Sequence, residues 1–540
     1  MLYKPFNELF ETKALAEYTA TINRPENHLK HLICKKNRLK SFSLKQAGIF
    51  YDFSRQRVDE KAMELLFNLA EKRKLKHYFN AMVSGEKVNT SENRAALHTA
   101  TRNFSKDPVY VDGKDIMQDI IKVNVNIKTF VSNVHSGKIK GSTCKVFEHI
   151  VVIGIGGSYL GTEFAAGALC AYAKKNIKLH FLSNVDIDNF GNIASLIDPE
   201  TTLWVVISKS FTTAETMANT KQAYALMKDK GLDPSKHFVT VTSKGSPGDN
   251  ASNSIITSFH MFDFIGGRYS LTSAVGGVPL GLCFGYDIFE RILKGANEMD
   301  LHAKNAPVTE NIPLVAALIS IWNSVFLKYP SNAIIPYASV LSKLAPHIQQ
   351  LNMESNGKSV SKHGDFINYP AGVIIFGEPG TNAQHSFFQL AHQGQPFPIE
   401  FIGVIKPVYH QYKETSKGVT NHQELWANMI SQAKALAVGK DDSNKTKHFS
   451  GNRPSSTILI ADVSPENIGR LLSFYEAKTV FEAFILGINP FDQFGVELGK
   501  TMASDIRKEI VQKNKSQKYS FAKSDHTTSF YLETLFSEKL

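Results

Sequence analysis

Residues 203–216 read LWVVISKSFTTAET, a stretch that predicts a strand, a turn rich in hydroxyl groups and the start of a helix. The apolar run 203–207 is rich in β-branched and aromatic residues, which is typical of a strand covered on both faces of a parallel sheet. Thr212 and Glu215 have the spacing of a capping box, so we expect a helix to begin there. Because a helix N-terminus presents free N–H groups and a positive dipole end, this turn is suited to bind phosphate.

A purely structural role is also open for the hydroxyl groups of this turn. Serine and threonine commonly accept hydrogen bonds from the first N–H groups of a helix, and for any single hydroxyl that role is the commoner one. Several hydroxyls together with Lys209 in one turn make the two interpretations about equal.

Apolar runs alternate with helix-like stretches along most of the chain. Strands are predicted at 150–155, 179–182, 203–207 and 238–241, and a second series at 333–336, 372–376, 401–405 and 457–461. This alternation predicts an α/β fold with parallel, doubly wound sheets. We expect residues 1 to about 110 to be helical without a strand, and the chain from Lys500 onward to form a helix, a basic turn and a second helix.

A second turn, residues 154–162 with the sequence GIGGSYLGT, follows the strand predicted at 150–155. It matches neither the dinucleotide fingerprint, which needs glycine at Tyr159, nor the Walker loop, which needs lysine at Thr162. Its glycines still allow a ligand to approach the backbone. Since ligands bind at the carboxyl ends of parallel strands, we expect this turn and the turn after Ile207 to face one crevice.

Composition narrows the class of protein. The 540 residues favour two domains, and a hydrophobic content of 43% with 21% charged residues is that of a globular protein. The most apolar window, 312–327, is too short to cross a bilayer and predicts a buried helix. Four scattered cysteines and the acidic residues near the N-terminus lead us to expect a cytoplasmic protein with no membrane partner.

The net charge of +11 leaves association with polyanions as one alternative. The 61 basic residues are nevertheless spread along the chain, and no nucleic-acid motif accompanies them, so we expect no nucleic-acid partner. No zinc spacing or calcium loop is present in the sequence, and we expect no metal.

Four residues stand in polar clusters beside predicted strands or helices: Glu354, His385, Lys500 and Arg268. Taken one at a time, each is more often a surface or salt-bridge residue than a catalytic one. Together they supply a carboxylate base, a histidine and a lysine for proton transfer at oxygen, and an arginine for a developing oxyanion. This set suits proton abstraction beside the carbonyl group of a sugar phosphate.

The motifs at these positions closely resemble those of the glucose-6-phosphate isomerase family. They occur in order over most of the chain, as GIGGS at 154–158, SKSFTTAET at 208–216, GGRYS at 266–270, MESNGK at 353–358, GEPGT at 377–381 with Gln384 and His385, and FDQFGVE at 491–497 with Lys500. NRAALHT at 93–99 and GNRP at 451–454 also look like this family.

The resemblance implies two αβα sandwich domains of the sugar-isomerase (SIS) type, each with a doubly wound, mostly parallel sheet, plus a helical N-terminal region and a C-terminal helical arm. The domains would comprise 112–285, and 1–111 with 286–505, followed by the arm at 506–540. It also implies a homodimer that interconverts glucose 6-phosphate and fructose 6-phosphate through an enediol without a cofactor. A non-catalytic sugar-phosphate-binding module with the same fold is the alternative.

The resemblance further implies a role for each site residue. Glu354 would move a proton between C2 and C1, Arg268 would stabilise the enediolate, and His385, reaching over from the partner subunit, would assist ring opening with Lys500. The residues implied to bind substrate are Ser208, Lys209, Ser210 and Thr213 at the phosphate, and Gly157, Ser158, Gly267, Gln350 and Gln493 around the sugar.

Two positions depart from the family pattern. Ser210 stands where threonine is usual and keeps the hydroxyl group. Thr272 stands where tryptophan is expected, and we expect looser packing behind Arg268 as a result.

Overall fold

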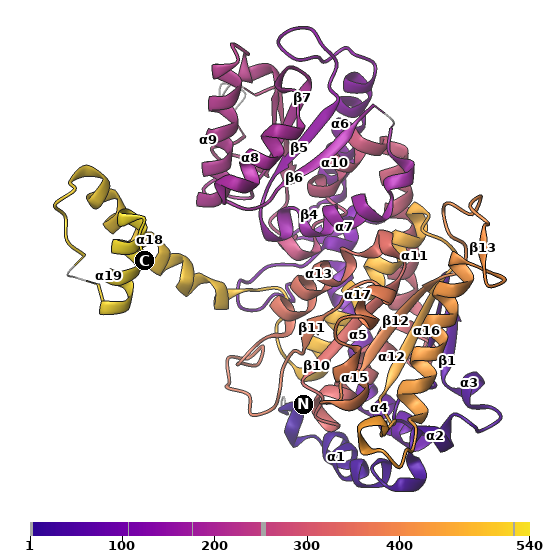
Figure 1. The fold of residues 1–540 in the computed structure, drawn as a ribbon. Helices are drawn as coiled ribbons and strands as arrows, with labels where there is room; N and C mark the ends of the chain where they lie inside the picture. Colours follow the sequence, from indigo (N-terminus) through magenta and orange to yellow (C-terminus); the bar gives the residue numbers. More distant parts are fainter. Residues whose placement is uncertain (1–3, 106, 175, 250–254, 522–523) are drawn as a thin grey trace. The chain divides into compact units, whose positions relative to one another are not determined.

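The computed structural model describes residues 4–105, 107–174, 176–249, 255–521 and 524–540. The chain forms two compact units, Met1–Phe491 and Asp492–Leu540, called here the first and the second unit. The first unit contains two large sheets and the helices that cover them (Figure 1). No helix in the described ranges combines the length and the apolar character that a membrane span requires.

The first sheet is five-stranded and parallel, in the order β6-β5-β7-β8-β9. Its strands are β5 (His149–Ile153), β6 (Lys178–Leu182), β7 (Thr202–Ile207), β8 (Phe238–Ser243) and β9 (Thr257–Met261). Every residue of β7 is buried. Leu203, Val205 and Ile207 pack into one apolar core while Trp204 and Val206 pack into another, so the prediction of a strand covered on both faces is confirmed.

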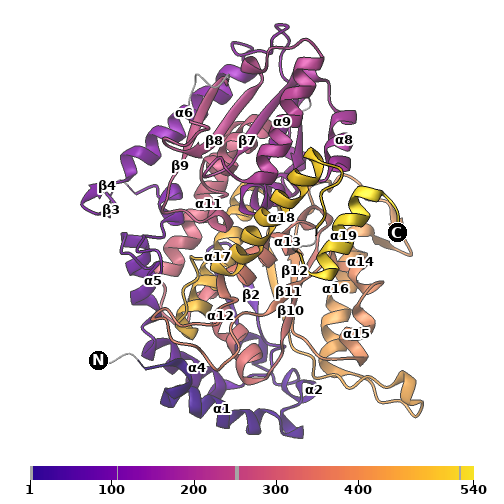
Figure 2. The ribbon, with the colours of Figure 1, turned by 90° about the vertical axis from the view of Figure 1, so that its left-hand side faces the viewer.

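Helices cover the two faces of this sheet (Figure 2). On one face, α6 (Met117–His135) and α10 (Ala274–Phe284) share an apolar core with alternate residues of β5 and β7. On the other, α8 (Ile187–Leu196) and α9 (Ala214–Asp229) pack against the remaining residues. A further helix, α7 (Leu160–Ala168), follows β5. The α/β class predicted from the alternating pattern is therefore confirmed.

The second sheet is six-stranded, in the order β1-β2-β15-β12-β10-β11. Its parallel part comprises β10 (Ser331–Tyr337), β11 (Ile374–Phe376), β12 (Ile399–Val404) and β15 (Ser455–Ile460). The edge is an antiparallel hairpin, β1 (Ser43–Gln46) and β2 (Ile49–Asp52), in which β2 pairs with β15. All eight strands predicted from the sequence are present in the two sheets.

The expectation that residues 1 to about 110 contain no strand is wrong because of this hairpin. Its two turn residues, Ala47 and Gly48, both have positive φ angles, of 45° and 75°. This is the backbone of a type I′ turn, which matches the twist of paired strands. The available signal was the apolar run Ile49–Tyr51 directly after the Ala47–Gly48 turn, and the side chains of Ile49 and Tyr51 are fully buried in the structure.

Helix α17 (Pro465–Leu486) runs through the main core of the first unit and is buried along almost its whole length. It packs against α11 (Tyr286–Asn305) and α12 (Ile312–Ile321), which continues as a buried π-helix, Trp322–Phe326. Gly295 and Gly469 permit the close crossing of α11 and α17: a methyl group on either would lie 1.9 or 2.0 Å from a carbonyl oxygen of the other helix. The buried helix predicted at 312–327 is confirmed.

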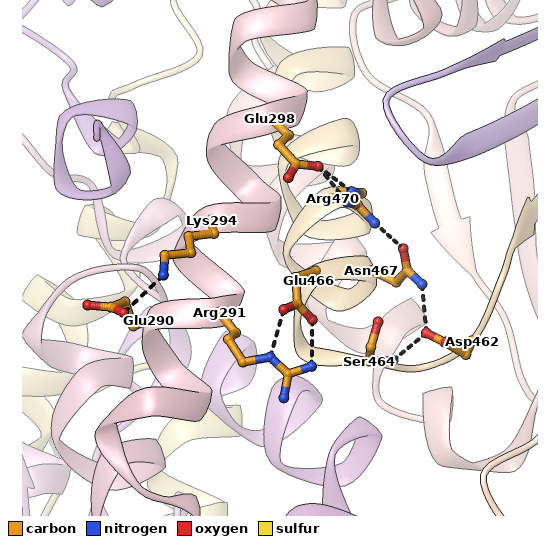
Figure 3. A network of polar contacts seen from close by, with 9 residues as sticks. All are labelled: Glu290, Arg291, Lys294, Glu298, Asp462, Ser464, Glu466, Asn467 and Arg470. Atoms are coloured by element: carbon orange, nitrogen blue, oxygen red, sulfur yellow. Dashed lines mark hydrogen bonds and ion pairs between the residues drawn. The ribbon is translucent and has the colours of Figure 1, made fainter. Parts of the chain in front are cut away.

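Ion pairs line the exposed part of the seam between α11 and α17 (Figure 3). Arg291 binds Glu466 through Nε and Nη2 at 2.6 and 2.9 Å, and Arg470 binds Glu298. Deeper in the core, Arg102 binds Asp300 and Glu476, all three being buried. The crossing of the two helices is thus fixed by glycine contacts and by charge pairs.

The other elements complete the first unit. Its N-terminal helices are α1 (Phe10–Ile22), α2 (Leu29–Leu32), α3 (Arg38–Ser41), α4 (Glu60–Lys72) and α5 (Leu75–Ser84). Around the second sheet lie α13 (Leu344–Ile348), α14 (Gly380–Gln384), α15 (Phe388–Gln393) and α16 (Asn421–Val438). Two short hairpins are formed by β3 (Tyr110–Val111) with β4 (Lys114–Asp115), and by β13 (Thr415–Ser416) with β14 (Val419–Thr420).

The second unit consists of two helices joined by a turn. They are α18 (Glu497–Lys515) and α19 (His526–Ser537). Lys513 donates to the carbonyl oxygens of Gln517 and Tyr519 at 2.7 and 2.9 Å, which closes the basic turn after α18. The predicted order of helix, basic turn and helix is confirmed.

Candidate active site

The hydroxyl-rich turn, residues 208–213, connects β7 to α9 and is closed by its own side chains. Ser208 Oγ accepts from the Phe211 N–H at 3.1 Å and lies 3.4 Å from Thr213 Oγ1. Ser210 Oγ and Thr212 Oγ1 are 2.7 Å apart. Ser210 thus makes this contact through its hydroxyl group, which the threonine usual at position 210 would also have. Phe211 has a φ angle of 55°, in the left-handed region that non-glycine residues seldom adopt. The turn is therefore a defined structure and not an open loop.

The capping box predicted for Thr212 and Glu215 is wrong. The N-cap of α9 is Thr213, and among the described residues its side chain makes no capping hydrogen bond. The hydroxyl of Thr212 pairs instead with Ser210, because the chain turns through the strained Phe211 before the helix begins. The first N–H groups of α9 are thus not occupied by this cap, which suits the binding of an anion.

Lys209 supplies the cation of this turn. Its Nζ lies 3.2 Å from the carbonyl oxygen and 3.4 Å from Oδ1 of Asp263. Its carbonyl oxygen accepts from the backbone N–H of Ser243 at 3.1 Å, which ties the turn to the end of β8. Burial lowers the pKa of the Lys209 ammonium group. The lysine is held at the carboxyl end of the sheet with about a third of its side chain exposed.

The glycine turn after β5 packs directly against the turn that carries Arg268. Gly156–Ser158 and Gly267–Tyr269 each form a short 3₁₀ helix. A methyl group at Gly157 would lie only 2.2 Å from the carbonyl carbon of Gly267, and Ser270 Oγ donates to the Gly157 carbonyl at 3.2 Å. The close approach of the two turns therefore needs glycine at position 157.

The same glycine turn also reaches the neighbouring structural elements. A methyl group at Gly156 would lie 3.2 Å from Nε2 of Gln350, and one at Gly154 would lie 3.4 Å from the carbonyl oxygen of Ile207, which directly precedes the hydroxyl-rich turn. Since β5 and β7 are parallel neighbours, both turns lie at the same edge of the sheet. The two turns thus lie at one edge of the sheet, and that they face one crevice remains a prediction.

Arg268 is fixed beside Glu354. Nε donates to Ser355 Oγ at 2.7 Å, Nη2 donates to the carbonyl oxygen of Pro490 at 2.6 Å, and Nη1 lies 3.5 Å from Glu354 Oε1. The Arg268 side chain is 1% exposed and that of Glu354 is 22% exposed. Glu354 ends a π-helix, Gln349–Glu354, a type of turn that is frequent at functional sites. A buried cation therefore faces a carboxylate that solvent can reach.

Residues next to the predicted ones complete this arrangement, and sequence reasoning missed them. Tyr269 Oη lies 3.0 Å from Ser355 Oγ, and the ring of His98 stacks on Tyr269 at 4.6 Å. Burial holds the pKa of His98 well below its usual value. The signal was their position: Tyr269 and Ser355 directly follow Arg268 and Glu354 in the two motifs, and His98 lies in NRAALHT.

Thr272, which stands where tryptophan is expected, is buried behind this group. Its Oγ1 lies 2.8 Å from Oγ1 of Thr101, and only 1% of the residue is exposed. The position is thus occupied by a pair of hydroxyl groups.

The other predicted residues with polar side chains are His385, Gln493 and Lys500, which lie on other elements of the chain. His385 directly follows α14 and is exposed, and no contact within the described ranges joins it to Arg268 or Glu354. The neighbouring Gln384 is anchored by Tyr337 and Asn428, at 2.9 and 3.0 Å. Gln493 and Lys500 belong to the second unit, where Gln493 precedes a 3₁₀ turn and Lys500 is an exposed residue of α18.

The structure combines two αβα sandwiches, a hydroxyl-rich turn at the end of a central parallel strand, and an arginine–carboxylate pair. These features define the class of sugar-isomerase-type proteins. The family described as "Phosphoglucose isomerase" matches residues 52–529. The chain belongs to this phosphoglucose isomerase family, as the sequence motifs predicted.

Individual relatives agree with this membership. The chain is 61% identical to "Glucose-6-phosphate isomerase" of Desulfosudis oleivorans, over 97% of both chains. It is 42% identical to "Glucose-6-phosphate isomerase, cytosolic B" of Oryza sativa subsp. japonica, over 92% of this chain and 90% of the relative. The crystal structure of a glucose-6-phosphate isomerase from Chlamydia trachomatis superposes with a TM-score of 0.89 at 36% identity, covering 99% of this chain and 100% of that one.

Proposed function

We propose that this protein is an enzyme that interconverts glucose 6-phosphate and fructose 6-phosphate. The observation that carries the proposal is the pair formed by the buried Arg268 guanidinium and the partly exposed Glu354 carboxylate, 3.5 Å apart. A base next to a fixed cation is what proton abstraction beside a carbonyl requires, because the negative charge develops where the cation stands. A metal or an organic cofactor is not part of this proposal.

In the forward direction Glu354 takes the proton from C2 of the open-chain sugar. The C2–H electron pair forms a C1=C2 double bond and the electrons of the C1 carbonyl move onto O1, which gives an enediolate that Arg268 stabilises. Glu354 then returns its proton to C1. The proton of O2 is transferred to O1, so that C2 becomes the carbonyl of fructose 6-phosphate. A positioned base typically contributes about 10²–10⁴ in rate.

The phosphate group is placed at the hydroxyl-rich turn. Its ligands would be the side chains of Ser208, Lys209, Ser210 and Thr213, assisted by the uncapped start of α9. The sugar would lie against the glycine contact between Gly157 and Gly267, and the other residues assigned to it are Ser158, Gln350 and Gln493.

The proposal includes a homodimer in which His385 of each subunit completes the site of the other. It is supported by the exposure of His385 and by the lack of any contact between its side chain and the Arg268–Glu354 pair in the described residues. His385 and Lys500 would assist ring opening. We keep the division into domains 112–285, 1–111 with 286–505, and an arm at 506–540, and place the protein in the cytosol, in line with plant relatives that are named cytosolic.

Turnover in both directions, followed by a coupled assay, tests the proposal. Glu354→Gln is expected to lose turnover and the exchange of the C2 proton with solvent deuterium, because the base is gone. Glu64→Gln is the matched control, since Glu64 is exposed and pairs with Lys61 at the surface. If wild-type protein binds glucose 6-phosphate without converting it, the protein is a non-catalytic binding module and the proposal is wrong.

A further inference from the structure

The π-helix that carries Glu354 is held from behind by a buried carboxylate of α17. Glu482 Oε2 accepts from Nδ2 of Asn352 at 2.6 Å and from Nδ2 of Asn356 at 2.9 Å. All three residues are 3% exposed or less. Asn352 and Asn356 lie two residues before and two residues after Glu354, so a single oxygen atom holds both sides of the turn.

The chemistry of these bonds fixes one geometry. A carboxylate oxygen only accepts, so each asparagine must present its NH₂ group to Glu482 and cannot rotate by 180° without facing oxygen with oxygen. Bonds to an ionised acceptor are shorter and about twice as strong as bonds between neutral groups. Asn356 Nδ2 also lies 3.3 Å from the Thr479 carbonyl oxygen, one turn earlier on α17.

The backbone around Glu354 makes such side-chain bonds important. A π-helix is wider than an α-helix and is a local exception to the regular ladder. Ser355, which directly follows Glu354, contacts Arg268 Nε at 2.7 Å and Tyr269 Oη at 3.0 Å. The turn is thus held by side-chain bonds to a buried cation, Arg268, and to a buried carboxylate, Glu482, and displacement of either would move Glu354.

We propose that Glu482 is a positioning residue, which acts through Asn352 and Asn356 to fix Glu354 for proton transfer. This inference rests on the proposed function. Under this proposal the orientation of the Glu354 carboxylate depends on a residue of a core helix, 128 positions away along the chain. That residue lies outside the motifs quoted above for the family.

Glu482→Gln is the sharpest test, because the amide keeps the size of the side chain and one acceptor oxygen but removes the charge. A displacement of about 1 Å at a reacting group can cost about 100-fold in rate. We expect kcat to fall by about 10-fold to 100-fold, while KM for glucose 6-phosphate stays within about 2-fold, because the phosphate turn belongs to the other sheet.

Glu400→Gln is the matched control, because Glu400 is a second buried carboxylate that is hydrogen-bonded to residues of α17. Glu400 contacts Lys478 Nζ at 2.8 Å and Tyr475 Oη at 3.0 Å, both on α17, and makes no contact with Asn352 or Asn356 in the described residues. It should lower the thermal midpoint, since Lys478 loses its partner, but leave kcat unchanged for the folded protein. Asn352→Ala removes one of the two bonds and serves if Glu482→Gln does not fold, with kcat again reduced and KM retained.

The outcomes separate the two proposals. If wild-type protein turns over and the folded Glu482→Gln variant has wild-type kcat, or loses activity only in KM or in parallel with Glu400→Gln, the positioning role is wrong and the proposed function stands. If wild-type protein does not interconvert the sugar phosphates, both proposals fall. A selective loss of kcat in Glu482→Gln or Asn352→Ala supports the positioning role.

Discussion

The contact between Gly157 and Gly267 yields a prediction whose size follows from the structure. In Gly157→Ala the added methyl group would lie 2.2 Å from C, 2.5 Å from O and 2.6 Å from Cα of Gly267. Non-bonded carbon atoms need about 3.5 Å, so the two turns must separate by about 1 Å. Arg268 follows Gly267 directly and should move with it, which changes its distance to Glu354.

A shift of this size at a reacting group costs about 100-fold in kcat/KM, or about 2.7 kcal/mol of transition-state stabilisation. Overpacking should also lower the free energy of unfolding, by about 1–3 kcal/mol. Both quantities are measurable, the first by initial rates at low substrate concentration and the second by urea unfolding.

Gly191→Ala is the control for the substitution itself. Gly191 lies in α8, and apart from the neighbouring backbone of that helix no atom of the described residues lies within 4 Å of an added methyl group, so activity should be unchanged and stability should rise by about 0.5–1 kcal/mol. If Gly157→Ala keeps kcat/KM within 2-fold of wild type while it remains folded, the turns are not rigid and the reasoning about their contact is refuted.

Three further predictions concern phosphate binding, acid stability and the dimer. Ser210→Ala and Thr213→Ala should raise KM with little change in kcat, because helix-end anion binding is worth up to about 2 kcal/mol; lower kcat at unchanged KM would contradict this. Burial lowers the pKa of His347 from 6.5 to about 4, so below pH 6.5 the unfolded chain binds more protons than the folded one, and the free energy of unfolding decreases as the pH is lowered. His347→Phe should remove roughly 3 kcal/mol of that loss between pH 7 and pH 4, measured by urea unfolding. The same dependence of stability on pH in the variant and the wild type would disprove this. Mixing inactive His385→Ala with inactive Glu354→Gln after subunit exchange should restore roughly a quarter of wild-type activity, since each mixed dimer has one intact site, whereas no recovery would place His385 in its own subunit's site.

The sequence alone was sufficient for features that a short stretch determines. The run 203–207 is a buried strand because five apolar side chains in a row must be covered on both faces of the sheet. The turn predicted directly after it is present, between Ile207 and the start of α9. The hairpin β1–β2 was missed because Lys45 and Gln46 on its exposed strand hide the alternation. Edge strand β9 was missed for the same reason, since three of its five residues are only partly buried.

Contacts between residues far apart in the sequence could not be predicted in this way. They separate the groups proposed to touch substrate from the buried residues that hold those groups in place. The groups proposed to touch substrate lie on turns and helices within motifs that are visible in the sequence. What holds them is buried and distant: Ser355 meets Arg268 87 positions away, and Asn352 meets Glu482 130 positions away. Glu482 sits in a core helix, where neighbouring residues give no sign that a carboxylate has a functional partner. It follows that substitutions in the hydroxyl-rich turn should act first on substrate binding, whereas substitutions of the buried polar residues that hold Glu354 should act on kcat, because only the second set fixes the position of the base.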